Sequence, residues 1–286
     1  MGQTIACANQ KGGVGKTTTV VNLAADLALD GERVLVVDVD PQGNATSGFG
    51  IDRSQLRTTL YDVILGDADV RSTIVPTEID GCVIAPASVA LAGAEVELAN
   101  VEQRERRLAR VLAHVVDEFD YILLDCPPSL GLLTVNALTA ADSVLIPTQC
   151  EYYALEGLSQ LIATLNLVRD NLNPSLAIKG VVLTMYDART NLSADVAAEV
   201  RRHLGSAVLD TVIPRSVRLS EAPSFGQPIA RYRPESRGAI AYAELSRELR
   251  RRDGRLAAPE AAAGIPPRPL HREPASETVL VMGGRP

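Results

Sequence analysis

The chain has 286 residues, a formal net charge of −7 and 46% hydrophobic residues. This length suits one large domain or two small ones, and the ordinary share of apolar and charged residues excludes a wholly disordered chain. Aromatic residues make up only 3% and tryptophan is missing, so the core must be built from aliphatic side chains and alanine. The negative net charge, taken alone, argues against nucleic acid as a partner.

Short apolar runs alternate with longer helical patterns along the chain. Because several runs are apolar throughout, they are typical of parallel strands buried on both faces. Strands are predicted at Thr4–Ala8, Arg33–Val37, Cys82–Ala85, Tyr121–Asp125, Ser143–Pro147, Ile178–Met185 and Val208–Ile213. Helices are predicted at Lys16–Leu29, Arg104–Glu118, Leu132–Ala140, Leu155–Asn171, Ser193–Leu204 and Arg237–Arg252. This alternation predicts an α/β fold with a doubly wound, mostly parallel sheet and helices on both faces.

The composition changes after Arg252. Residues 253–286 contain six prolines among alanine, glycine and arginine, with no sustained helical or strand pattern. Such a segment buries too little apolar surface to offset its ordering entropy. We therefore predict a folded domain at 1–252 and a disordered, Pro/Ala-rich tail at 253–286.

Cysteine spacing and hydropathy indicate the compartment. Cys7, Cys82, Cys126 and Cys150 lie far apart without metal-ligand spacing, and most of them lie in or beside apolar runs, where reduced, buried thiols are expected. The chain opens without a secretory signal and has no uncharged apolar run of about 18 residues. These features predict a cytoplasmic protein that does not bind membranes.

A glycine-rich loop follows the first predicted strand and opens the first predicted helix. It reads Lys11-Gly12-Gly13-Val14-Gly15-Lys16-Thr17-Thr18. In this arrangement, backbone N–H groups and the helix dipole face an anion, so the loop predicts a phosphate site. We expect Lys16 to reach the β- and γ-phosphates and the Thr17 hydroxyl to bind Mg²⁺.

The loop departs from the standard phosphate-loop motif at its first position. The first glycine of that motif would fall at position 10, which is Gln10 here, and a second lysine, Lys11, follows it. One lysine suffices for a triphosphate bound to its own subunit. Lys11, on the outer rim of the loop, is placed to reach a phosphate held by another subunit.

Together with two further segments, this loop resembles the ParA/MinD class of deviant-Walker P-loop ATPases. Those segments are Val36–Asn44 and Leu123–Ser129, and the stretch Ile213–Ser224 is similar to the ParA/Soj chromosome-partitioning branch. The resemblance runs from residue 2 to about residue 250. It implies a P-loop NTPase fold, ATP and Mg²⁺ as cofactors, and an ATP-dependent homodimer whose interface Lys11 crosses. Gly12 would lie where the two loops approach closely.

The resemblance also assigns roles to acidic residues at strand ends. Asp40 matches the residue that orients the attacking water, and phosphoryl transfer does need a carboxylate for an in-line water and cations such as Lys11 and Lys16 on the developing charge. One of the pair Asp38 and Asp40 could instead support Mg²⁺ through a water, or both aspartates could simply cap the strand end. Asp125 matches the Walker B acid and would hold Mg²⁺ through a water or through Thr17, since this ion keeps several waters in its shell.

Two further segments are expected near the nucleotide. Pro214 and Arg215 match the family segment that packs around the adenine base. Glu151, Tyr152 and Tyr153 follow a strand end and would flank the nucleotide or the dimer interface, although exposed tyrosine pairs more often serve packing.

The charge is unevenly distributed along the chain. Residues 201–237 contain seven arginines and three acidic residues, a local charge of +4 in an acidic protein. A few arginine–phosphate contacts suffice for sequence-independent, salt-sensitive DNA binding. In the ParA family, arginines that match Arg189 and Arg218 face DNA. The alternative is a solvated charged face.

The resemblance predicts an ATPase that dimerises on ATP, binds DNA non-specifically at the nucleoid, and leaves it after hydrolysis stimulated by a ParB-like partner. One alternative is a membrane-associated cell-division regulator that resembles MinD, but no amphipathic membrane helix is evident after Arg252. A second keeps the ATPase and changes its cargo, which sequence discriminates poorly. A third, an iron–sulfur carrier, lacks suitably spaced cysteines.

Overall fold

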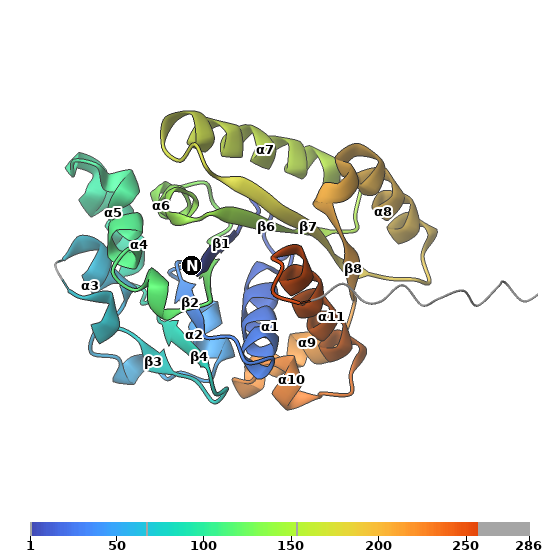
Figure 1. Ribbon diagram of the computed structural model, residues 1–286, viewed down its shortest axis with the longest axis horizontal. Coiled ribbons are helices and arrows are strands. Elements are labelled where there is room, and N and C mark those ends of the chain that lie inside the picture. The colour runs from blue at the N-terminus through green and yellow to red at the C-terminus, as the bar shows by residue number, and fades with distance from the viewer. Residues whose placement is uncertain (1, 67, 153, 257–286) are drawn as a thin grey trace, which may run out of the picture.

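The computed structural model describes residues 2–66, 68–152 and 154–256. Their centre is an eight-stranded sheet with the order β3-β4-β2-β5-β1-β6-β7-β8 (Figure 1). All neighbouring pairs are parallel except β3 and β4, which are antiparallel. The strands are β1 (Gln3–Cys7), β2 (Val34–Asp38), β3 (Val75–Pro76), β4 (Cys82–Ala85), β5 (Tyr121–Asp125), β6 (Ser143–Gln149), β7 (Ala177–Tyr186) and β8 (Val208–Pro214).

Helices cover both faces of this sheet. One face packs against α3 (Leu60–Leu65), α4 (Leu91–Glu97), α5 (Arg107–Leu112), α6 (Leu132–Ala140), α7 (Ala154–Asn171) and α8 (Asn191–Leu204). The other packs against α1 (Lys16–Leu29), α2 (Asn44–Gly48), α9 (Val217–Glu221), α10 (Ile229–Tyr232) and α11 (Arg237–Arg252). This confirms the predicted doubly wound architecture.

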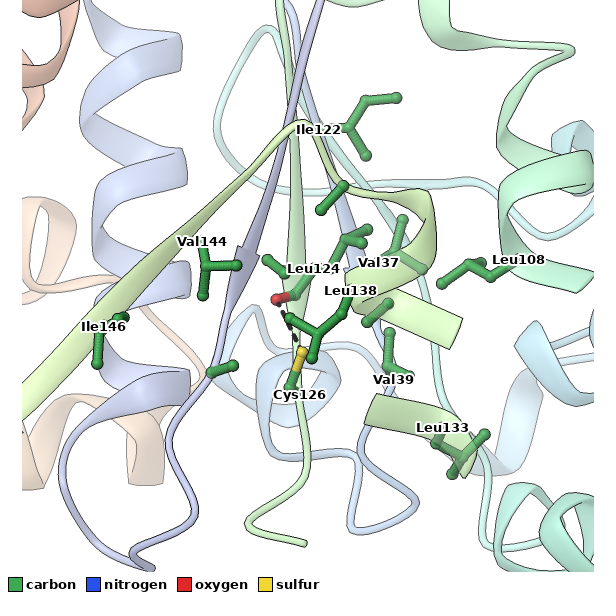
Figure 2. Packing of buried hydrophobic residues seen from close by; sticks show 14 of the residues in the cluster. Val37, Val39, Leu108, Ile122, Leu124, Cys126, Leu133, Leu138, Val144 and Ile146 are labelled. Atoms are coloured by element: carbon green, nitrogen blue, oxygen red, sulfur yellow. Dashed lines mark hydrogen bonds between the residues drawn. The ribbon is translucent and has the colours of Figure 1, made fainter. Parts of the chain in front are cut away.

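The core is aliphatic, as the composition requires. Figure 2 shows side chains of the central strands, among them Val37, Leu124 and Val144, packed with Leu133 and Leu138 of α6. Each of these side chains is at most 2% exposed. All four cysteines are buried, and burial raises the pKa of the Cys126 thiol, which is held in its neutral form.

The predicted helix at Arg104–Glu118 is wrong as one continuous element. Only α5 is α-helical, with single 3₁₀ turns at Arg104–Arg106 and Val116–Glu118. The buried amide of Asn136 on α6 explains the first break. It accepts from the backbone N–H of Leu108 at 3.1 Å and donates to the carbonyl of Arg104 at 2.9 Å, so a tertiary contact replaces helical bonds.

The carboxyl ends of the parallel strands meet at one edge of the sheet. The glycine-rich loop follows β1, Asp40 follows β2, Asp125 ends β5, and Pro214 ends β8. Ligands of open α/β sheets bind in the crevice outside these strand ends. The fold therefore brings together segments that lie about 200 residues apart in sequence.

Candidate nucleotide-binding site

The loop after β1 has the conformation of an anion cradle. Gly13 and Gly15 have φ angles of +73° and +92°, which residues with a Cβ adopt only under strain, and Gly15 caps the N-terminus of α1. The Lys16 side chain folds back over the loop, where Nζ donates to the Lys11 carbonyl at 3.3 Å. The backbone N–H groups at this helix start are oriented to bind phosphate.

A cavity of about 300 Å³ lies directly against this loop. Its walls combine the loop with residues after β2 and β5 and one residue near the end of β7, namely Gly12, Gly13, Gly15, Lys16, Thr17, Thr18, Asp40, Gln42, Asn44, Pro128 and Met185. A Cβ placed on Gly12 or Gly13 would meet no atom within 4 Å, so the loop is open on its outer side. The predicted loop residues and Asp40 thus share one cavity.

Two buried aspartates end the strands β2 and β5, which lead into residues that line the cavity. Asp38 and Asp125 are register partners on β2 and β5, and neither is exposed to solvent. Burial and the neighbouring charge of Asp38 raise the pKa of Asp125 well above its usual value, while the Thr17 hydroxyl acts in the opposite direction. Burial also raises the pKa of Asp38 to about 6, against hydrogen bonds from Thr46.

Unpaired carboxylate oxygens make this pair a fitting cation site. Within the described residues, neither oxygen of Asp125 nor Oδ1 of Asp38 has a hydrogen-bond partner. Buried oxygens of this kind are costly unless a cation or water satisfies them. No three His, Cys, Asp or Glu side chains in the described ranges are grouped to bind a metal by themselves. A magnesium ion that keeps most of its waters, with Thr17 and Asp125 nearby, fits this donor set.

Asp38 has a second function that the sequence left open. Its Oδ2 accepts from the backbone N–H of Thr46 at 2.8 Å and from the Thr46 hydroxyl at 2.6 Å. Thr46 lies in the first turn of α2, so Asp38 stabilises the start of that helix. Asp40 is different, since it lines the cavity and its Oδ1 accepts from the Gln42 N–H at 2.9 Å.

A second cavity, of about 360 Å³, adjoins the first through shared lining residues. Pro214 and Arg215 line it together with Thr18, Met185 and Tyr242. Met185 lines both cavities and has a φ of +51°, an unusual backbone conformation for a residue with a side chain. Strain of this kind tends to occur at functional sites.

Lys11 lies at the rim of the loop in an ion pair. Its Nζ is 2.8 Å from Oε2 of Glu151, and both side chains are about 40% exposed. Glu151 therefore lies next to the loop. Tyr152 is 79% exposed, and Tyr153 lies outside the described residues.

The two predicted DNA-contacting arginines follow neighbouring strand ends. Arg189, in the loop after β7, is 86% exposed and pairs with Asp187 at 2.7 Å. Arg218, on α9 after β8, pairs with Glu221 at 2.7 Å. Because the Arg215 N–H donates to the Tyr186 carbonyl at 2.9 Å, the two segments are held side by side.

Sequence reasoning missed several residues that build the site. Asn9, Thr46, Thr184 and Met185 carry no motif, and their importance comes from contacts with segments remote in sequence. One available signal was topological: Thr184 and Met185 lie at the carboxyl end of a predicted parallel strand, where ligand sites form.

The fold and this site define a P-loop nucleotide-binding protein, and comparisons with known proteins narrow the class. Residues 2–178 match a family model described as an AAA domain. The chain is 58% identical over 249 residues to the sporulation initiation inhibitor protein Soj of Bacillus subtilis, which covers 87% of this chain and 98% of that protein. It is 53% identical over 253 residues to the chromosome partitioning protein ParA of Myxococcus xanthus, 88% and 89% of the two chains.

A solved structure of a nucleotide-binding protein shares the fold of this chain. Cobyrinic acid a,c-diamide synthase from Mycobacterium smegmatis, with bound ADP and magnesium, has a TM-score of 0.78 and 41% identity, and the match covers 88% of this chain and 96% of that one. The chain belongs to the ParA/Soj family of chromosome-partitioning P-loop ATPases.

Proposed function

We propose that this chain is a Mg²⁺-dependent ATPase that converts ATP and water to ADP and phosphate to partition chromosomal or plasmid DNA. In this proposal ATP joins two copies into a dimer, the dimer binds nucleoid DNA without sequence preference, and hydrolysis stimulated by a ParB-like partner releases it. The observation that carries the ATPase is the cavity that the phosphate loop shares with Asp40, together with buried aspartate oxygens at the neighbouring strand ends that have no hydrogen-bond partner among the described residues.

Each group in the cavity has a chemical task in hydrolysis. The loop N–H groups and Lys16 bind the phosphates, and Thr17 and Asp125 hold Mg²⁺, which when bound neutralises phosphate charge. The Asp40 carboxylate, fixed by the Gln42 N–H, orients the attacking water. Pro214 and Arg215 line the pocket for the base.

Lys11 connects this chemistry to dimerisation. In the single chain its ammonium is bound to Glu151 at the rim, half exposed, and contacts between such exposed groups contribute little stability. The ammonium can therefore exchange Glu151 for a phosphate held by the partner subunit at small cost. This exchange makes the dimer depend on bound ATP.

DNA binding is assigned to the basic stretch that follows β7 and β8. Arg189 and Arg218 are exposed there. Each pairs with an acidic residue two or three positions away in sequence, Asp187 and Glu221, and phosphate oxygens can replace these carboxylates. The rest of the protein carries the excess of negative charge, which keeps affinity low for the monomer.

Two substitutions test the hydrolysis and DNA parts separately. Asp40→Ala should abolish hydrolysis while Mg-ATP still binds, so a long-lived DNA-bound dimer accumulates on a sizing column and in filter binding. Arg218→Glu should lower ATP-dependent DNA affinity by about tenfold or more and flatten its salt dependence. Arg71→Glu is the matched control, because Arg71 is similarly exposed and paired but lies outside the basic stretch.

Contrary results would reject specific parts of the proposal. Wild-type hydrolysis by Asp40→Ala would remove that residue from the reaction. Unchanged DNA affinity of Arg218→Glu, or an equal loss in Arg71→Glu, would remove the basic stretch as the DNA surface.

The membrane-associated alternative finds no support in the described helices. None of them is long and apolar enough to span a bilayer. The last described helix, α11, is amphipathic, and Tyr242, Leu245 and Leu249 of its apolar face are buried in the core, while Ile240 is 51% exposed. Co-sedimentation with anionic liposomes in the presence of ATP would reveal a membrane-binding function.

A further inference from the structure

The end of β7 contacts the phosphate loop through one hydroxyl. Thr184 is 2% exposed, and its Oγ1 donates to the backbone carbonyl of Val14, in the middle of the loop, at 2.8 Å. The Thr184 carbonyl accepts from the Cys150 N–H at 3.2 Å, so the end of β7 is itself fixed to the segment after β6. The hydroxyl is therefore a rigid donor aimed at the loop.

The Val14 carbonyl needs such a donor because the residue that follows it is a glycine. The Val14–Gly15 peptide rotates about ψ of Val14 and φ of Gly15. Gly15 has a φ of +92°, and glycine permits this rotation at little energetic cost. A flip of the Val14–Gly15 peptide would turn its carbonyl towards the phosphates and its N–H away from them. An anion site built from backbone N–H groups is lost by this rotation.

Other contacts fix the position of the loop but not this peptide. The Asn9 side chain donates to the Pro147 carbonyl at 2.7 Å and accepts from the Lys11 N–H at 3.0 Å, which holds the loop entry. The Val14 side chain is 1% exposed and packed in the interior. Among the described residues, the hydrogen bond to the Val14–Gly15 peptide comes from the Thr184 hydroxyl.

We propose that Thr184 is a positioning residue that holds the Val14–Gly15 peptide in its anion-binding orientation before nucleotide arrives. This inference rests on the proposed binding of nucleotide phosphates by the loop. It assigns part of the phosphate affinity to a strand about 170 residues away from the loop in sequence. Thr184 does not touch the reacting atoms in this role.

The test removes the hydroxyl of Thr184 while keeping a β-branched side chain of the same size. Thr184→Val lacks the hydroxyl, Thr184→Ser retains it, and Thr184→Ala removes it without the β-branch. Thr148→Val is the matched control, since Thr148 is also 2% exposed near the end of the neighbouring strand β6, but its hydroxyl contacts the Ile146 carbonyl of its own strand at 3.5 Å. Binding of Mg-ATP and of Mg-tripolyphosphate is measured by titration calorimetry.

We expect Thr184→Val and Thr184→Ala to bind both ligands about tenfold more weakly, because a buried carbonyl loses its donor. Thr184→Ser and Thr148→Val should stay within about twofold of wild type. In steady-state hydrolysis, KM should rise with kcat retained, since bound phosphates restore the peptide orientation. A merely structural residue would lower the melting temperature without this division between KM and kcat.

Several results would overturn the inference. These are wild-type affinity in Thr184→Val, failure of Thr184→Ser to restore it, loss of ATP but not tripolyphosphate binding, or a lower kcat with unchanged KM. Lys16→Ala separates this from the proposed function. If Lys16→Ala binds Mg-ATP as wild type does, the loop is not the phosphate site and both proposals fail.

Discussion

Asp26 shows how a single buried carboxyl can set a pH dependence. It lies on α1 facing α11, is 7% exposed, and its Oδ2 has no hydrogen-bond partner among the described residues. Burial, then the charge of Asp30, raises its pKa to about 7, and Arg247 on α11 opposes this shift. The folded protein therefore holds a proton that the unfolded chain releases near pH 4.

This shift predicts that stability falls as pH rises from about 4 to 7, because the folded state binds more protons in that window. Asp26→Asn should remove the effect, with a gain in unfolding free energy that is about 2–3 kcal/mol larger at pH 8 than at pH 5. Urea unfolding at both pH values measures it. Asp195→Asn, an exposed aspartate on α8, is the control, and an equal gain at both pH values for Asp26→Asn would contradict the assignment.

At the scale of elements, the hydrophobic pattern of the sequence predicted the long helices but not the short ones. The helices at Lys16–Leu29, Leu132–Ala140 and Arg237–Arg252 have the predicted bounds. The first and last of these are long enough to show an apolar face, which the sequence pattern reveals. The short helices α2, α9 and α10 were not predicted, since four or five residues carry no period. The positions of these short helices are determined by contacts with segments remote in sequence.

The candidate site divides in the same way. The phosphate loop and the strand-end acids could be predicted, because each belongs to a motif of consecutive residues at the start or end of a regular element. Thr184 and Asn9 were not, since each acts through a hydrogen bond to a backbone carbonyl that only the folded chain brings near. The role of Asp38, which stabilises the start of α2, could not be predicted either, because it depends on the position of Thr46 in the folded chain.

The contact between α2 and the segment after α9 joins two of these short elements. Gly226, after the 3₁₀ turn Ala222–Phe225, has a φ of +62°, and a Cβ there would lie 2.6 Å from the Cα of Gly50. Gly226→Ala should cost about 2–4 kcal/mol of unfolding free energy, from backbone strain and the forced separation of the two backbones.

Gly31→Ala isolates the strain component of that cost. Gly31 has a φ of +93°, but a Cβ on it would meet no atom within 4 Å. We expect a loss of about 1 kcal/mol there. Equal losses in the two variants, measured by urea unfolding, would show that the close approach of Gly50 and Gly226 contributes nothing.

At the scale of the whole molecule, residues just beyond α11 pack against the amino ends of the strands, on the side of the sheet away from the nucleotide site. Asp253 pairs with Lys179 of β7 and accepts from the Tyr121 hydroxyl at 2.8 Å, and its side chain is only 4% exposed. Arg255 pairs with Glu32 at 2.9 Å and lies over the Tyr121 ring. Part of the proposed tail at 253–286 thus contacts the domain; residues 257–286 lie outside the described residues.

These contacts predict that a chain ending at Arg252 is less stable than one ending at residue 256. Asp253→Ala alone should lower the unfolding free energy by about 3–5 kcal/mol, because Lys179 is left as a buried charge without its carboxylate. Adding Lys179→Met should recover part of the loss, since the double variant buries no unpaired charge. The exposed pair Asp69–Arg71 is the control, and Asp69→Ala should cost less than about 1 kcal/mol. Denaturant midpoints that do not differ between Asp253→Ala and Asp69→Ala would show that the chain end is not anchored by this ion pair.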